Sequence, residues 1–284
     1  MQELLPLFAQ EGVPVVALKG LALAPLIYAK DYLRPMRDID LLVPKHKLLH
    51  AADLLRSLGF DLPMEHSNKF MRYSNQLPGA TKVVNGFSVS IELHHDCLAR
   101  DVKGHLQYGD VSQQLQTVRW RELELLALGH EQMLHHLCRH LEDAQPGAVL
   151  KLINVLDIVL YAETHKAQIN WAMLKQHYAH VLNTLKCLQM IVPLSKALQG
   201  EVGEVSQASI AGVGETALSM RAINAMQAPF STKLKLLFLP PDWWLHLFYN
   251  IDPRHTLFFT KFVSHPIHLF WTLLKRMRSL LFGR

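Results

Sequence analysis

Cysteine is scarce in this 284-residue chain, which contains only Cys97, Cys138 and Cys187. The three lie far apart, are odd in number and form no Cys-x-x-Cys pair. A disulfide framework needs pairs, and a structural zinc knuckle needs closely spaced ligands, so the sequence argues against both. Free thiols are typical of a reducing compartment, and we expect a cytoplasmic protein.

Long apolar runs are missing as well. No uninterrupted stretch approaches the roughly 18 apolar residues that a membrane-spanning helix requires. Residues 1–6 contain no basic segment leading into an apolar core, which a secretory signal would need. We therefore expect neither secretion nor a transmembrane anchor, and leave open a peripheral position at the inner face of the membrane.

What the chain does contain is apolar material and positive charge. Half of its residues are hydrophobic, enough for the cores of two modest domains or one large one. The net charge is +5 and the pI is near 9.1, which favours polyanionic partners such as nucleotides, nucleic acid or an acidic membrane. No segment resembles a nucleic-acid-reading module, so we expect no sequence-specific nucleic-acid binding.

The N-terminal third alternates between helical and strand patterns. Apolar spacing predicts a helix over residues 3–10, a short strand over residues 13–18 and a second helix over residues 21–28. Gly20 then lies at a strand-to-helix turn, where free backbone N–H groups and the helix dipole favour a phosphate, and Lys19 adds positive charge. A tight turn beside a surface lysine explains the same residues.

The strongest chemical signal lies in residues 34–43, which read RPMRDIDLLV. Successive strand side chains point to opposite faces, so Asp38 and Asp40 share one face while the apolar residues face the core. Two carboxylates held together repel unless a cation lies between them, and hard oxygen ligands suit Mg²⁺ or Mn²⁺. The alternative is a pair of solvated acids at the start of an edge strand.

A second strand supplies another carboxylate. Residues 87–94 alternate apolar and polar side chains with the period of a half-buried strand, which places Glu92 and His94 on the polar face. If this strand lies beside the first, Glu92 completes a ligand set with Asp38 and Asp40 for one or two divalent ions. His94 would orient substrate or accept a proton, unless it is a structural histidine.

Two further patterns complete this region. Residues 44–58 predict a helix with one apolar side, closed by Gly59. Residues 69–73 fit a strand. Helices and strands therefore alternate through the N-terminal third.

Two arginines flank the acids. A guanidinium can form paired hydrogen bonds to phosphate oxygens, so Arg34 and Arg37 could balance the charge of a bound nucleotide. They could equally neutralise Asp38 and Asp40 by ion pairing. Arg37, adjacent to Asp38, would point to the opposite face of a strand, so Arg34 is the better phosphate ligand.

Beyond about residue 100 the pattern turns helical. Long amphipathic stretches cover residues 122–141, 149–164 and 171–198, and no strand signal of comparable strength recurs. We therefore divide the chain into an N-terminal domain of residues 1–118 and a helical domain of residues 119–284. The second domain ends in an aromatic, basic tail.

Histidines gather in the first of these helical stretches. They are His130, His135, His136 and His140. His136 and His140 are spaced i,i+4 as a helical zinc pair would be, but no Glu stands between them in the His-Glu-x-x-His arrangement of a metalloprotease. Histidines that fill helix–helix contacts explain the cluster with fewer assumptions than a metal site, and we favour that interpretation.

The C-terminal tail, which follows a linker expected at residues 201–209, is rich in aromatic and basic side chains. The aromatic residues are Trp243, Trp244, Phe248, Tyr249, Phe258, Phe259, Phe262, Phe270 and Trp271, and the basic run is Lys275-Arg276-Met277-Arg278. Pro240-Pro241 and Pro266 should divide the tail into short helices. Packing within the protein or a dimer is the favoured role, and docking on a membrane surface or a partner is the alternative.

Several of these segments together resemble one known family. Residues 18–20, 33–43 and 91–96 are similar to the pattern "LKG … RpmrDiDLLV … vElHw" of an uncharacterised nucleotidyltransferase family, and residues 131–140 and 152–158 resemble its next helices. The likeness covers about residues 10–180. This family belongs to the DNA polymerase β-like nucleotidyltransferase superfamily.

The resemblance implies an α+β fold, with a mixed sheet and flanking helices followed by an all-helical domain. It also implies that Asp38 and Asp40 hold Mg²⁺ or Mn²⁺ against a triphosphate while Glu92 helps hold a second ion. The reaction would transfer a nucleoside monophosphate from a nucleoside triphosphate to a small molecule, a sugar-like compound or a protein, and release pyrophosphate. Two features differ from the superfamily: Lys19-Gly20 stands where Gly-Gly or Gly-Ser is usual, and Glu92 replaces a more frequent Asp.

A different class of function fits the same resemblance. The chain would then be a catalytically silent nucleotide-binding or scaffold protein in a biosynthetic or surface-polysaccharide assembly. A silent descendant has no chemical reason to retain three converging carboxylates, so their presence favours catalysis.

Overall fold

The computed structural model describes residues 1–63, 74–98, 104–142, 151–189, 192–203 and 256–271, together with residues 231, 238, 239, 245, 249 and 274. The chain divides into two compact units. The sheet unit comprises residues 1–64 and 75–226, and the tail unit comprises residues 65–74 and 227–284. The expected strand at residues 69–73 lies outside the described residues, as do residues 204–209 of the expected linker.

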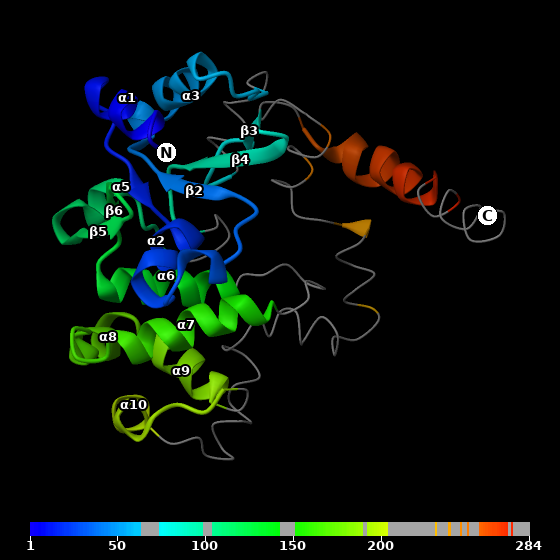
Figure 1. The fold of residues 1–284 in the computed structure, drawn as a ribbon. Helices are drawn as coiled ribbons and strands as arrows, with labels where there is room; N and C mark the ends of the chain where they lie inside the picture. Colours follow the sequence, from blue (N-terminus) through cyan, green and yellow to red (C-terminus); the bar gives the residue numbers. More distant parts are fainter. Residues whose placement is uncertain are drawn as a thin grey trace. The chain divides into compact units, whose positions relative to one another are not determined.

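A six-stranded mixed sheet forms the centre of the sheet unit (Figure 1). Its strands are β1 (Val16–Ala17), β2 (Ile39–Leu42), β3 (Ala80–Val84), β4 (Phe87–His94), β5 (Gln116–Trp120) and β6 (Leu123–Ala127), in the order β3-β4-β2-β1-β6-β5. Strand β2 runs parallel to β4 and β1 runs parallel to β6, whereas the other neighbours are antiparallel. The α+β fold class and the mixed sheet are confirmed.

Strand β2 lies in the middle of this sheet, between β4 and β1. Leu41, Leu42 and Val43 are fully buried, and Asp40 is only 3% exposed. The interpretation of solvated acids on an edge strand is therefore wrong for Asp40. A buried carboxylate at this position needs a partner of opposite charge.

Helices cover the sheet on both sides. They are α1 (Leu4–Gln10), α2 (Lys19–Ile27), α3 (Leu48–Ser57), α5 (Tyr108–Val111), α6 (His130–Glu142), α7 (Leu152–Thr164), α8 (Trp171–His177), α9 (Ala179–Leu188) and α10 (Lys196–Val202), with short 3₁₀ turns η1 (Asp31–Leu33), η2 (Lys45–Lys47) and η3 (Ser112–Gln114). In Figure 1, α1 and α3 lie above the sheet, and α2, α6 and α7 lie below it. Helix α7 packs against both α2 and α6.

The helix expected from residue 122 begins later, because residues 123–127 form strand β6. Strand β6 pairs with β5 through a tight turn in which Arg121 has a φ of +58°. Only Leu125 and Ala127 of this strand are buried, so its leucines suited a helix or a strand equally well. The helical region starts at His130, and the expected boundary between residues 118 and 119 falls inside β5.

Pro266 does not divide the tail as expected. Residues 258–271 form one helix, which includes a π-helical turn at Thr260–Ser264. Proline lacks an N–H group and crowds the carbonyl four residues earlier, and a π turn relieves both problems within a continuous helix. Among the described residues, no helix is both long enough and apolar enough to cross a membrane.

Candidate active site

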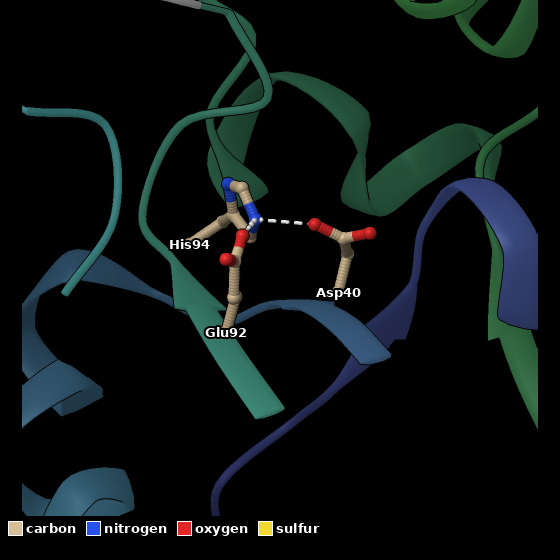
Figure 2. Close-up of side chains that lie close together, drawn as sticks. All are labelled: Asp40, Glu92 and His94. Carbon is tan, nitrogen blue, oxygen red and sulfur yellow. Dashed lines mark hydrogen bonds and ion pairs between the residues drawn. The ribbon is translucent and has the colours of Figure 1, made fainter. Parts of the chain in front are cut away.

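The site is built on two neighbouring strands. In the parallel pair β2 and β4, Asp40 lies opposite Glu92 and Leu42 lies opposite His94. Because side chains alternate along a strand, Asp40, Glu92 and His94 project to the same face of the sheet. One ligand atom from each lies within 4.8 Å of the others, and Figure 2 shows the three side chains converging from the two strands. The sequence predicted that Asp40, Glu92 and His94 would share a face.

His94 links the two carboxylates. Its Nε2 is 2.9 Å from Asp40 Oδ1 and 3.7 Å from Glu92 Oε2. Asn75 Nδ2 donates to the backbone oxygen of Asp96 and lies 3.4 Å from His94 Nδ1. An amide N–H directed at Nδ1 makes that nitrogen the acceptor, so the ring proton is on Nε2 and is donated to Asp40.

A cation already touches the buried carboxylate. Lys19 Nζ lies 2.7 Å from Asp40 Oδ1. Lys19 is the first residue of α2 and has a φ of +41°, in the left-handed region that L side chains rarely adopt. The strained backbone thus directs an ammonium group to the place where a carboxylate needs positive charge.

The three carboxylates differ in their electrostatics. Burial alone would raise the pKa of Asp40, but the hydrogen bond from His94 and the charge of Lys19 hold that pKa well below its usual range. The pKa of Glu92 is also lowered, by His94 first and by Gln76, whose Nε2 donates to Glu92 Oε2 at 2.7 Å.

Asp38 behaves in the opposite way. It is exposed and lies just before β2, outside the group of three described above. Partial desolvation, followed by the negative charges of Asp40 and Glu92, raises its pKa. Lys19 and His94 therefore do not offset all of the negative charge here. This donor set of hard oxygens with uncompensated charge fits a divalent cation.

A cleft of about 430 Å³ opens beside these residues. It is lined by Lys19, Gly20, Arg34, Arg37, Asp38 and Asp40, which the sequence indicated, and by Leu137 and His140 of α6 and by Lys151, Leu152, Ile153, Asn154 and Asp157 at the start of α7. Four basic side chains and three carboxylates thus share one cleft. Gly20 lies in the first turn of α2, where a side chain would meet Met36 Cγ at 2.7 Å.

Arg34 has a partner that neither sequence interpretation named. Its Nε and Nη2 donate to the two carboxylate oxygens of Asp157 on α7, at 2.9 and 2.7 Å. Tyr28 Oη donates to the same carboxylate at 2.7 Å. Arg34 also borders the cleft, so this pairing fixes its position at the rim. Asp157 was missed, although a lone carboxylate in an apolar helix is a signal of a buried partner.

The histidines of α6 mostly fill helix contacts. His135 Nδ1 lies 2.7 Å from His180 Nε2 on α9, and His130 Nδ1 lies 2.9 Å from Tyr161 Oη on α7. In the ranges that the structure describes, none of them belongs to a group that could hold a metal ion. His140 differs, because it borders the cleft. The favoured helix-packing interpretation therefore fits His130 and His135.

Comparison with known proteins defines the family. The family model described as "Uncharacterised nucleotidyltransferase" matches residues 1–200. This span contains both strands of the site, the start of α2 and the α7 wall of the cleft. The chain belongs to this nucleotidyltransferase family.

Membership in that family makes the protein a nucleotidyltransferase, and the family match does not identify its acceptor. It is also similar to the solution structure of the antibiotic-resistance factor ANT(2'')-Ia, with 12% sequence identity and a TM-score of 0.39. The match covers 63% of this chain and 95% of that chain. No curated protein matches the sequence. The resemblance that the sequence motifs indicated is confirmed by the family model.

Proposed function

We propose that this protein transfers a nucleoside monophosphate from a nucleoside triphosphate to an acceptor, with the help of Mg²⁺ or Mn²⁺, and releases pyrophosphate. The observation that carries the proposal is the register of β2 and β4, which sets Glu92 opposite Asp40. Asp40 in turn borders a cleft lined by basic side chains. Family membership supports the same reaction class.

The metal ligands in this proposal are Asp38, Asp40 and Glu92. His94 lies in one group with Asp40 and Glu92. A divalent cation bound there would neutralise phosphate charge and stabilise the entering and leaving oxygens of the displacement. Asp38 supports this assignment because partial desolvation, followed by the charges of Asp40 and Glu92, raises its pKa, and a bound cation would offset both effects. His94 holds one oxygen of Asp40 and so orients the carboxylate.

The basic side chains of the cleft would bind the triphosphate. Lys19 can exchange Asp40 for a phosphate oxygen, and the free N–H groups at the start of α2, including that of Gly20, favour an anion. Arg37 is exposed and borders the cleft, whereas Arg34 is held at its rim by Asp157. These four residues are the proposed nucleotide ligands, and the acceptor would bind against the wall formed by α6 and α7.

Thermal unfolding tests the proposal. Melting of the full chain is compared with and without ATP, GTP, CTP and UTP, each with and without Mg²⁺. A ligand at 100 times its dissociation constant stabilises the native state by about 2.7 kcal/mol, or roughly 5–10 °C for a domain of this size. We expect one nucleotide to give a Mg²⁺-dependent shift that Asp40→Asn abolishes and that exposed Asp38→Asn weakens.

The matched control is Asp53→Asn, an exposed carboxylate on α3 away from the cleft. It should keep the full nucleotide shift. Each variant is judged by its own shift between the free and the liganded state, so a change in intrinsic stability does not affect the result. Absence of a shift with every nucleotide at millimolar concentration would contradict the proposal, as would an undiminished shift in Asp40→Asn. Binding without any pyrophosphate release would favour the catalytically silent protein.

A further inference from the structure

The helix of residues 258–271, orange to red in Figure 1, presents its apolar side to solvent. Phe258 is 73% exposed and Phe259 is 67% exposed, and further along the helix Phe270 and Trp271 are 60% and 59% exposed. Phe262, Val263, Ile267 and Leu274 are exposed as well. Few soluble surfaces carry so many large apolar side chains together, and such patches mark interaction sites.

Two polar side chains of the same helix are buried instead. Thr260 and His265 are 8% and 2% exposed, and His265 Nδ1 lies 2.9 Å from Tyr249 Oη of the same unit. A helix that packs on its own protein normally buries its apolar face. This helix is oriented the other way, so its own unit does not use the apolar face for packing.

The π-helical turn makes this apolar face continuous. An α-helix advances about 100° per residue, and a π turn, which holds more residues, advances less. The turn at Thr260–Ser264 therefore brings the apolar positions after Pro266 back onto the side occupied by Phe258 and Phe262. The rings of these two residues lie 5.1 Å apart.

The charge of the chain is concentrated in the same region. Residues 253–284 contain six of the 29 Lys and Arg residues and none of the 24 Asp and Glu residues. The rest of the chain therefore has 23 basic and 24 acidic residues and is nearly neutral. In the sequence, Lys275, Arg276 and Arg278 directly follow the apolar helix.

We propose that the helix of residues 258–271 docks on an anionic lipid surface. The aromatic face would enter the boundary between headgroups and acyl chains, and the basic residues would approach lipid phosphates, the arrangement of an interfacial amphipathic helix. A second copy of the chain is disfavoured as the occupant, because two such tails carry charge of one sign only. This proposal is independent of the nucleotidyltransferase reaction.

Co-sedimentation of the full chain with vesicles tests the inference. One set of vesicles is pure phosphatidylcholine, and the other also contains phosphatidylglycerol. We expect binding to the anionic vesicles that weakens as salt rises, and much weaker binding to the neutral ones. The double variant Phe259→Gln/Phe270→Gln should lower the affinity for anionic vesicles about tenfold or more. Because both side chains are exposed, their replacement should leave the fold intact.

A matched control exists in the sheet unit. Phe87, at the start of β4, is 76% exposed, and Phe87→Gln should bind anionic vesicles like the wild type. Equal binding by the double variant and the wild type would overturn the proposal, as would failure to bind anionic vesicles at low salt. Sedimentation equilibrium without lipid separates the remaining case: a dimer that the double variant abolishes would show that a second copy covers the face.

Discussion

Lys19 contacts the carboxylate that the proposed reaction uses as a metal ligand. The ammonium group and a divalent cation would compete for the charge of the same carboxylate, because Lys19 Nζ is only 2.7 Å from Asp40 Oδ1. A triphosphate offers the ammonium another anionic partner. Metal and nucleotide should consequently bind together more readily than either binds alone.

Removal of the Lys19 charge should separate these two effects. In Lys19→Met, we expect Mn²⁺ alone to bind about tenfold more tightly, because the competing cation is gone, and the nucleotide to bind more weakly. Electron paramagnetic resonance of free Mn²⁺ measures the first change, and the thermal shift measures the second.

Lys175→Met, at an exposed position on α8, is the control and should bind Mn²⁺ like the wild type. If Mn²⁺ affinity is unchanged in Lys19→Met but is lost in Asp40→Asn, the competition is absent while the metal site stands. If neither variant changes Mn²⁺ binding, the proposed metal site itself is in error.

Individual site residues differed in how far the sequence could reveal them. Glu92 and His94 follow from strict alternation in one strand, and Asp40 follows from the strand that precedes it. The three side chains come together because the two strands pair in parallel. The partnership of Arg34 with Asp157 joins positions 123 residues apart, and only the packing of α7 against α2 and α6 decides it. No local pattern encodes that choice.

At the scale of elements, the contact between Arg34 and Asp157 ties α7 to the loop before β2. Both side chains are largely buried, with 10% and 3% exposure. Loss of one partner leaves the other charge without compensation in a poorly solvated place, which typically costs about 3–5 kcal/mol. The helical region thus holds the loop that bears Arg37 and Asp38.

Asp157→Asn should lower the free energy of unfolding by about 3 kcal/mol, measured by urea denaturation at neutral pH. Arg34→Met/Asp157→Leu should recover much of this loss, because it removes both charges together. A decrease below about 0.5 kcal/mol in Asp157→Asn would indicate that solvent reaches the pair and that α7 is held by apolar contacts alone.

Element prediction succeeded where one signal dominated and failed where two competed. The strand of residues 87–94 has a clear period of two and was predicted with its bounds. Residues 123–127 contain three leucines whose spacing suits both a helix and a strand, and pairing with β5 decided the outcome. In the tail, Pro266 alone indicated a break, but a π-helical turn just before it lets the helix continue past the proline.

For the whole molecule, buried histidines make stability depend on pH. Burial, followed by the charges of His180 and Arg139, lowers the pKa of His135 to about 3. Burial lowers the pKa of His136 as well, and both of its ring nitrogens lack a hydrogen-bond partner among the described residues. In the unfolded chain a histidine has a pKa of about 6.5. Below that pH, these histidines therefore bind protons in the unfolded state but stay neutral in the folded state.

The free energy of unfolding should accordingly be fully retained above about pH 6.5 and fall steadily from there toward pH 3. His135 alone contributes a loss of about 2 kcal/mol at pH 5. His135→Phe, which keeps a ring against Tyr178, should reduce the slope in urea denaturation between pH 7 and pH 5. An identical slope in the variant would mean that other groups cause the acid sensitivity.

The topology of the sheet also has a consequence for the order of folding. Strand β1 is two residues long, and its pairing with β6 joins residue 16 to residue 126. During synthesis, the strand that bears Asp40 can pair with β4 well before β6 has emerged from the ribosome. Until then one edge of β1 stays open, next to the strand of the site, as a template for wrong pairing. The sheet is therefore completed only when the long-range pairing of β1 with β6 forms. A chain stalled before residue 127 would be prone to aggregate.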